Sequence, residues 1–94
     1  MAATIEVQKI ADGEFEVRVM EGRSATSHRV TLKAVDHERL TGGKVAPIEL
    51  IRRSFEFLLE HEPKESIPSR FDLTVISRYF PSYEREIRRR LDMT

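Results

Sequence analysis

Residues 5–19 read IEVQKIADGEFEVRV, and this stretch decides the fold of the N-terminal part of the chain. Apolar and polar side chains alternate on both sides of Ala11-Asp12-Gly13. A period of two residues is typical of a strand with one face on a core and the other in water. An Asp-Gly pair between two such runs is a hairpin signal. The stretch therefore predicts two antiparallel strands joined by a tight turn.

The length of this turn follows from the faces that the two strands must share. A two-residue loop would place Val7 opposite Arg18 and so mix the apolar face with the polar one. A three-residue loop places Val7 opposite Val17, and Glu6 opposite Arg18 on the wet face. A slip by one residue moves every side chain to the wrong face. We therefore predict the three-residue loop, with Gly13 in the left-handed region.

A third strand is expected after a polar loop. Residues 21–27 read EGRSATS and predict the loop, and apolar residues then alternate with polar ones over residues 28–34. Three sequential strands with short connections predict an antiparallel meander. Residues 36–40 predict a helical turn or an irregular exit, and the Gly pair that follows predicts a break in the chain.

The longest helix is predicted over residues 47–61. Pro47 suits the first helical position, and the Glu62-Pro63 pair ends the helix. Apolar residues at helical spacing give this segment one face for a core. The members of that face are Ile48, Ile51, Phe55, Leu58 and Leu59.

A second apolar stripe on the same helix is the candidate interface. It consists of Leu50 and Phe57, with His61 beside them, and lies almost opposite the first face. A stripe that no other helix covers would mark a contact with a partner. Two free sheet edges and a net charge of zero also favour self-association. We therefore expect a non-enzymatic accessory or interaction protein, with a second copy or another protein as its partner.

The last third of the chain predicts two short helices. Asp72 is placed as an N-cap before a very apolar segment, and Pro81 separates that segment from the final helix. The final helix has a narrow apolar face at a spacing of four residues. That face consists of Tyr83, Ile87 and Leu91.

Strands grouped before helices predict an α+β fold. We expect a single domain over residues 1–94, β-rich over 1–40 and helical over 46–92. Its architecture is a three-stranded antiparallel meander followed by about three helices packed on one sheet face.

Length and charge exclude several classes of protein. The chain has 94 residues, 16 Lys and Arg against 16 Asp and Glu, and no cysteine. A net charge of zero excludes the strong basic field that drives non-specific nucleic-acid binding. The missing cysteines exclude disulfides, thiolate zinc sites and a cysteine nucleophile. With no signal peptide and no long apolar run in the sequence, we expect a cytoplasmic protein without membrane contact.

Motifs for chemistry are few. Gly42-Gly43-Lys44 precedes a helix, but a phosphate-binding loop needs a glycine where Glu38 stands and a hydroxyl where Val45 stands. His28 is in phase with the apolar face of its strand and predicts a histidine at the rim of the core. His37 lies between carboxylates, without a second histidine at a metal-binding spacing. We therefore expect no catalytic residue, no metal and no cofactor.

Four arginines support an alternative function, a regulatory nucleic-acid-binding protein with an Arg-rich C-terminal helix. Helical arginines contact phosphates in many DNA-binding proteins. Acidic residues interleave with them, which favours a solvated helix face instead. The four are Arg78, Arg85, Arg88 and Arg89.

The segment Phe71-Asp72-Leu73-x-x-Ile76-x-x-Tyr79-Phe80-Pro81-x-Tyr83-Glu84 resembles a signature of small bacterial proteins of about this length with a β-rich N-terminal half. No function is assigned to that group. The resemblance covers the last 30 residues or so. It implies a bacterial protein with one α+β domain, and it implies no activity, cofactor or site residue.

Overall fold

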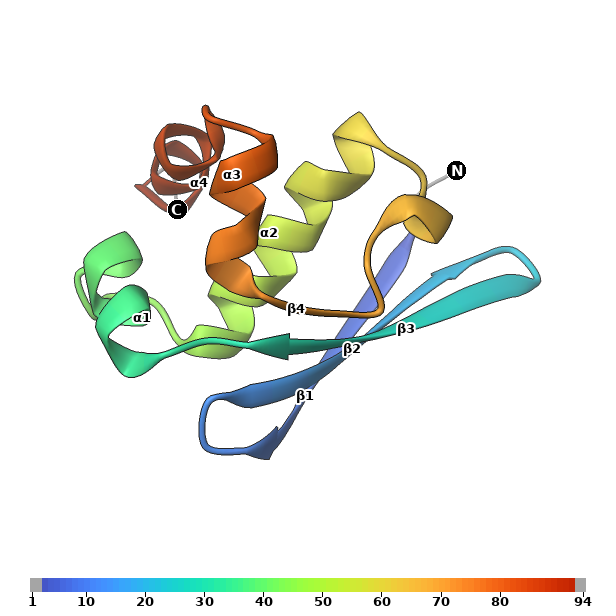
Figure 1. Ribbon diagram of the computed structural model, residues 1–94, viewed down its shortest axis with the longest axis horizontal. Coiled ribbons are helices and arrows are strands. Elements are labelled where there is room, and N and C mark those ends of the chain that lie inside the picture. The colour runs from blue at the N-terminus through green and yellow to red at the C-terminus, as the bar shows by residue number, and fades with distance from the viewer. Residues whose placement is uncertain (1–2, 93–94) are drawn as a thin grey trace.

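Helices cover one face of a four-stranded sheet, whose strand order is β1-β2-β3-β4 (Figure 1). The computed structural model describes residues 3–92. The elements are β1 (Thr4–Ala11), β2 (Glu14–Glu21), β3 (Ser24–Thr31), α1 (Ala34–Thr41), α2 (Pro47–His61), the 3₁₀ turn η1 (Lys64–Ser66), β4 (Arg70–Asp72), the 3₁₀ turn η2 (Leu73–Val75), α3 (Ile76–Tyr79) and α4 (Tyr83–Asp92). The predicted α+β fold, with three antiparallel strands first, is confirmed.

The register of the first hairpin is confirmed over residues 4–9, but the predicted three-residue loop is wrong: Ala11 pairs with Glu14, so the loop is Asp12-Gly13, and the register shifts between Lys9 and Ala11 instead. Val7 lies opposite Val17, and Glu6 lies opposite Arg18. Gly13 has a φ of 73°, and its carbonyl accepts a hydrogen bond of 2.9 Å from the Leu32 amide. A Cβ at Gly13 would lie 3.2 Å from the Leu32 carbonyl oxygen, so the turn needs glycine for both its conformation and its close approach.

The predicted loop over residues 21–27 is wrong. Strand β3 begins at Ser24, and Glu21 pairs with Ser24 across a two-residue turn whose first residue, Gly22, has a φ of 59°. The small polar residues of this segment lie at the tip of a hairpin, where most side chains are exposed. A strand exposed on both faces needs no apolar alternation, so its sequence gives no strand signal. The chain then leaves the sheet after Thr31, earlier than predicted, and α1 is a regular helix.

Strand β4 was not predicted. It pairs with β3 in parallel, with Val30 opposite Phe71 and Thr31 opposite Asp72. The buried His28 ring, 3% exposed, holds the loop that leads into β4. Its Nδ1 lies 2.8 Å from the Pro68 carbonyl oxygen, which can only accept, so Nδ1 carries a proton. The Thr26 hydroxyl lies 2.8 Å from Nε2. His28 is therefore a structural residue of the core.

Helix α2 lies between the sheet and the C-terminal helices (Figure 1). On one side, the Phe55 ring lies 5.4 Å from His28 and 6.0 Å from Phe71, measured between centroids. On the other side, the Phe57 ring lies 5.5 Å from Tyr83 at the start of α4. Leu50 and Phe57 are 0% and 1% exposed, so the prediction that they form an interface is wrong. The partner of their stripe is the C-terminal part of the same chain.

A buried pair of hydroxyls joins α4 to α2. The Ser54 hydroxyl donates to the Leu50 carbonyl at 2.8 Å, so its oxygen accepts from the Tyr83 hydroxyl at 2.6 Å. Burial raises the pKa of Tyr83 well above its usual range, although the hydrogen bond to Ser54 opposes this shift. Tyr83 therefore stays a neutral donor in the folded chain.

The Tyr83→Phe variant should lose about 1 kcal/mol of unfolding free energy, because it leaves the buried Ser54 oxygen without its donor. Urea denaturation followed by circular dichroism measures the change. Tyr79→Phe is the matched control, since Tyr79 is 72% exposed, and it should change stability by less than about 0.5 kcal/mol. Equal effects of the two substitutions would contradict the assigned hydrogen bond.

The Asp72 carboxylate joins β3 to the turn after β4. It accepts from the Thr31 hydroxyl at 2.7 Å, and from the Thr74 amide at 3.2 Å and hydroxyl at 2.5 Å. The predicted N-cap is confirmed, here for η2. Burial works to raise the pKa of Asp72, but the hydrogen bonds from Thr74 and Thr31 outweigh it and hold the pKa below its usual value.

Asp72 should make stability depend on pH. A carboxyl whose pKa is lowered by folding adds stability above its unfolded pKa, about 3.9, and this stability is lost as the pH falls through the folded pKa. Asp72→Asn should therefore be less stable than the wild type at pH 7, with the difference shrinking below about pH 4. Asp12→Asn is the control, because that side chain is fully exposed. A difference that does not change with pH would contradict the lowered pKa.

Candidate functional site

A groove lined by aromatic side chains runs between the end of α2, the loop over residues 62–69 and helix α3. Its volume is about 470 Å³, which is within the range of small binding sites. We call it the aromatic groove. Its lining residues are Leu58, Glu62, Ser66, Pro68, Phe71, Val75, Ile76, Tyr79 and Phe80.

Two contacts fix the loop that forms one wall of this groove. The His28 ring bonds to the Pro68 carbonyl, and the buried Lys64 ammonium donates to Glu65 at 2.8 Å and to Glu21 at 3.1 Å. The hydrogen bonds to the Glu65 and Glu21 carboxylates raise the pKa of Lys64, which therefore stays charged. These contacts tie the loop to β3 and to the end of β2.

The opposite wall ends in an exposed tyrosine. Helix α3 has only four residues, and Phe80 closes it by donating its amide to the Ile76 carbonyl at 2.8 Å. The Phe80 ring packs on Phe57 at 5.7 Å, edge to face. Tyr79 then points away from the core and is 72% exposed. Ile10 and Val35, the other large apolar residues exposed in the described part of the chain, line neither this groove nor the larger cavity near α1.

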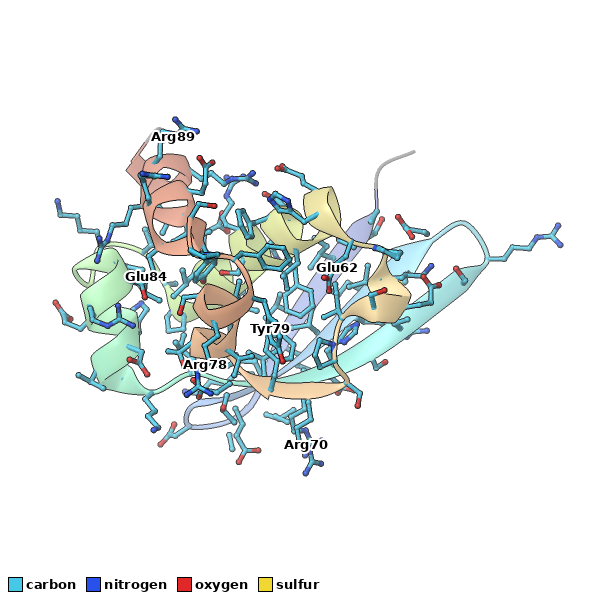
Figure 2. All side chains as sticks on the ribbon, turned by 45° about the horizontal axis from the view of Figure 1, so that its top comes forward. Glu62, Arg70, Arg78, Tyr79, Glu84 and Arg89 are labelled. Atoms are coloured by element: carbon cyan, nitrogen blue, oxygen red, sulfur yellow. The ribbon has the colours of Figure 1, made fainter. Side chains whose placement is uncertain are left out.

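Glu62 is the one charged residue that lines the aromatic groove. It is half-buried and follows the last residue of α2, with its amide bonded to the Leu58 carbonyl at 2.9 Å. Within residues 3–92 its carboxylate has no hydrogen-bond or ion-pair partner. A carboxylate without a partner gains free energy when a cationic donor reaches it. Figure 2 shows Glu62 and Tyr79 on the same side of the molecule.

His61 is the member of the predicted interface that lies at the surface. Its ring packs at a tilt against Phe57 and Phe80, with centroid distances of 4.6 Å and 5.1 Å, so it borders the aromatic cluster behind the groove. Sequence reasoning missed Glu62, Tyr79 and Phe80. The sequence contains one usable signal for an exposed side chain. Tyr79 and Phe80 are consecutive, and a helix of one turn cannot bury both of them.

The four arginines of the alternative prediction do not form one surface. Figure 2 shows Arg78, on α3, far from Arg89 near the end of α4. On α4, Arg89 pairs with Glu86 at 2.8 Å, and Arg88 donates to the Arg39 carbonyl at 3.4 Å. Arg85 is exposed.

One further cation of α4 is paired within the chain, and one carboxylate of α4 is paired with α1. Arg90 pairs with Glu60 at 2.6 Å and lies over the Phe57 ring, while Glu84 pairs with Arg39 of α1 at 2.8 Å. Two of the cations on α4 are therefore already balanced by carboxylates of the same chain.

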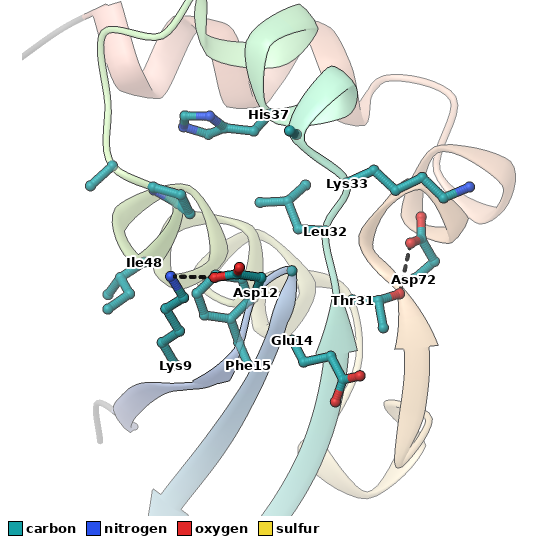
Figure 3. A pocket seen from close by; sticks show the side chains of 14 residues that line it. Lys9, Asp12, Glu14, Phe15, Thr31, Leu32, Lys33, His37, Ile48 and Asp72 are labelled. Atoms are coloured by element: carbon teal, nitrogen blue, oxygen red, sulfur yellow. Dashed lines mark hydrogen bonds and ion pairs between the residues drawn. The ribbon is translucent and has the colours of Figure 1, made fainter.

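A larger cavity of about 920 Å³ lies between the first hairpin turn and the starts of α1 and α2 (Figure 3). Phe15 and Leu32 form part of its apolar floor. Some of its polar groups are already paired: Lys9 lies 3.2 Å from Asp12, the Thr31 hydroxyl donates to Asp72 at 2.7 Å, and the His37 ring donates from Nε2 to the Val45 carbonyl at 2.5 Å. The hydrogen bond of His37 therefore connects α1 to the segment before α2.

Within residues 3–92 no three His, Cys, Asp or Glu side chains gather so that they could hold a metal ion. No helix of the described chain combines the length and the apolar character needed to cross a bilayer.

Comparison with protein-family models, curated proteins and solved structures gives no match for this chain. The resemblance of the C-terminal segment to small bacterial proteins therefore stays a prediction. The geometry of the aromatic groove is the basis for any functional conclusion.

Proposed function

We propose that the protein is a protein-binding module, and that its aromatic groove takes a short segment of a partner in which an apolar residue adjoins a lysine or arginine. The observation that carries this proposal is the exposed Tyr79 ring beside the unpaired carboxylate of Glu62. Tyrosine is enriched at the centres of protein interfaces, where a few aromatic anchors supply most of the binding energy.

The magnitudes favour a weak and reversible contact. Covering the exposed part of one tyrosine ring removes roughly 120 Å² from water and contributes about 3 kcal/mol. A hydrogen bond between a charged donor and Glu62 adds about 1.5–3 kcal/mol. The sum of about 5 kcal/mol is no larger than the cost of association, so these two groups alone support only a weak contact.

Binding fits the groove better than catalysis. Ser66 and Glu62 both line it, but no hydrogen bond joins them, and a nucleophile needs a base within hydrogen-bond reach. The nucleic-acid alternative is supported less well, because Arg78 lies far from Arg89 and Arg89 is already paired with Glu86.

The proposal can be tested by NMR titration of the ¹⁵N-labelled protein with two capped pentapeptides, ALRLA and ALELA, up to millimolar concentration. The arginine peptide should shift the amides of Glu62, Tyr79 and Phe80, and the glutamate peptide should bind more weakly. Glu62→Gln should remove this preference, and Tyr79→Ala should weaken binding about tenfold or more. Glu6→Gln is the matched control, an exposed carboxylate on β1.

Two results would count against the proposal. One is the absence of any shift at the groove with either peptide at the highest concentration. The other is a salt-sensitive shift of the Arg85 and Arg88 amides with a short DNA duplex, without a response to peptide, which would support the nucleic-acid alternative instead.

A further inference from the structure

The surface around Tyr79 carries an anion on one side and a cation on the other. Figure 2 shows Tyr79 between Glu62, at the end of α2, and Arg78, on α3. Arg78 is exposed, and neither Arg78 nor Glu62 has a partner among the described side chains. In that view the order is anion, aromatic ring, cation, and the ring and the cation belong to consecutive residues of the one-turn helix α3.

This order is self-complementary. Suppose that two copies of the chain are related by a two-fold axis near Tyr79. The axis exchanges the two sides of the surface, so each Glu62 meets the partner subunit's Arg78 and each Arg78 meets the partner subunit's Glu62. The Arg78-Tyr79 pair also has the chemistry that the groove is proposed to select, a cation beside an apolar ring.

We infer that the occupant of the aromatic groove is a second copy of this chain, an inference that rests on the proposed function of the groove. Tyr79 lies near the two-fold axis, against the partner subunit's Tyr79. Glu62 pairs with the partner subunit's Arg78, and the same pair forms a second time across the axis. The formal net charge of zero leaves little long-range repulsion between the copies.

The dimer formed in this way is a transient one. Stable interfaces bury about 800 Å² on each partner, which is more than one aromatic residue and two ion pairs supply. Association should therefore depend on protein concentration and should weaken as added salt screens the two pairs.

Sedimentation equilibrium from micromolar to millimolar protein tests the inference. E62R and R78E should each weaken dimerisation about tenfold or more, because each places like charges together twice. An equimolar mixture of the E62R and R78E chains should dimerise again, since both pairs then have opposite signs. R85E and E6R change exposed charges elsewhere and should leave dimerisation unchanged.

Circular dichroism confirms that each variant is folded, and E62Q, which removes the charge without adding bulk, should shift dimerisation in the same direction as E62R. A protein that remains monomeric at millimolar concentration overturns the inference, and so does a dimer that E62R and R78E leave intact. Neither result affects the peptide titration. Binding of ALRLA by a monomer would leave the proposed function standing while removing the second copy as the occupant.

Discussion

Helix α2 carries apolar side chains on two opposite sides, and the rest of the structure is arranged so that both sides are covered. The sheet supplies one cover, through the contact of Phe55 with His28 and Phe71. Helix α4 supplies the other, through the packing of Tyr83 on Phe57 and the hydroxyl pair of Tyr83 and Ser54. Without the C-terminal helices, the second stripe would lie in water, so this small domain depends on its last element for a closed core.

The parts of the fold that are set by local patterns could be predicted from sequence. The first hairpin alternates cleanly around Gly13, so even its register followed from the requirement that Val7 and Val17 share a face. The start of β3 could not be predicted, because its exposed tip lacks alternation. Strand β4 could not be predicted either, since its pairing with β3 depends on a contact between His28 and Pro68, which lie 40 residues apart along the chain.

The candidate site was harder to predict than the fold for a related reason. The amphipathic pattern of α2 identified an apolar stripe but could not say whether the chain itself covers it. Exposure of Tyr79 and partial burial of Phe80 depend on where a one-turn helix ends, and Glu62 matters because no cation among the described side chains reaches it. These are properties of tertiary packing, and a sequence pattern of two or 3.6 residues carries no information about them.

The position of Tyr83 also has a consequence for the order in which the protein can fold during synthesis. Ser54 and its partner Tyr83 are 29 residues apart, so α2 leaves the ribosome well before the side chain that completes its core. At about 5–20 residues per second, the bare stripe of α2 persists for roughly 1–6 s. During that interval the hairpins can already form, since their contacts are local. The growing chain therefore passes through a stage in which the hairpins of β1–β3 can form while one apolar stripe of α2 is still exposed, and β4 and α4, which complete the sheet and the core, follow later.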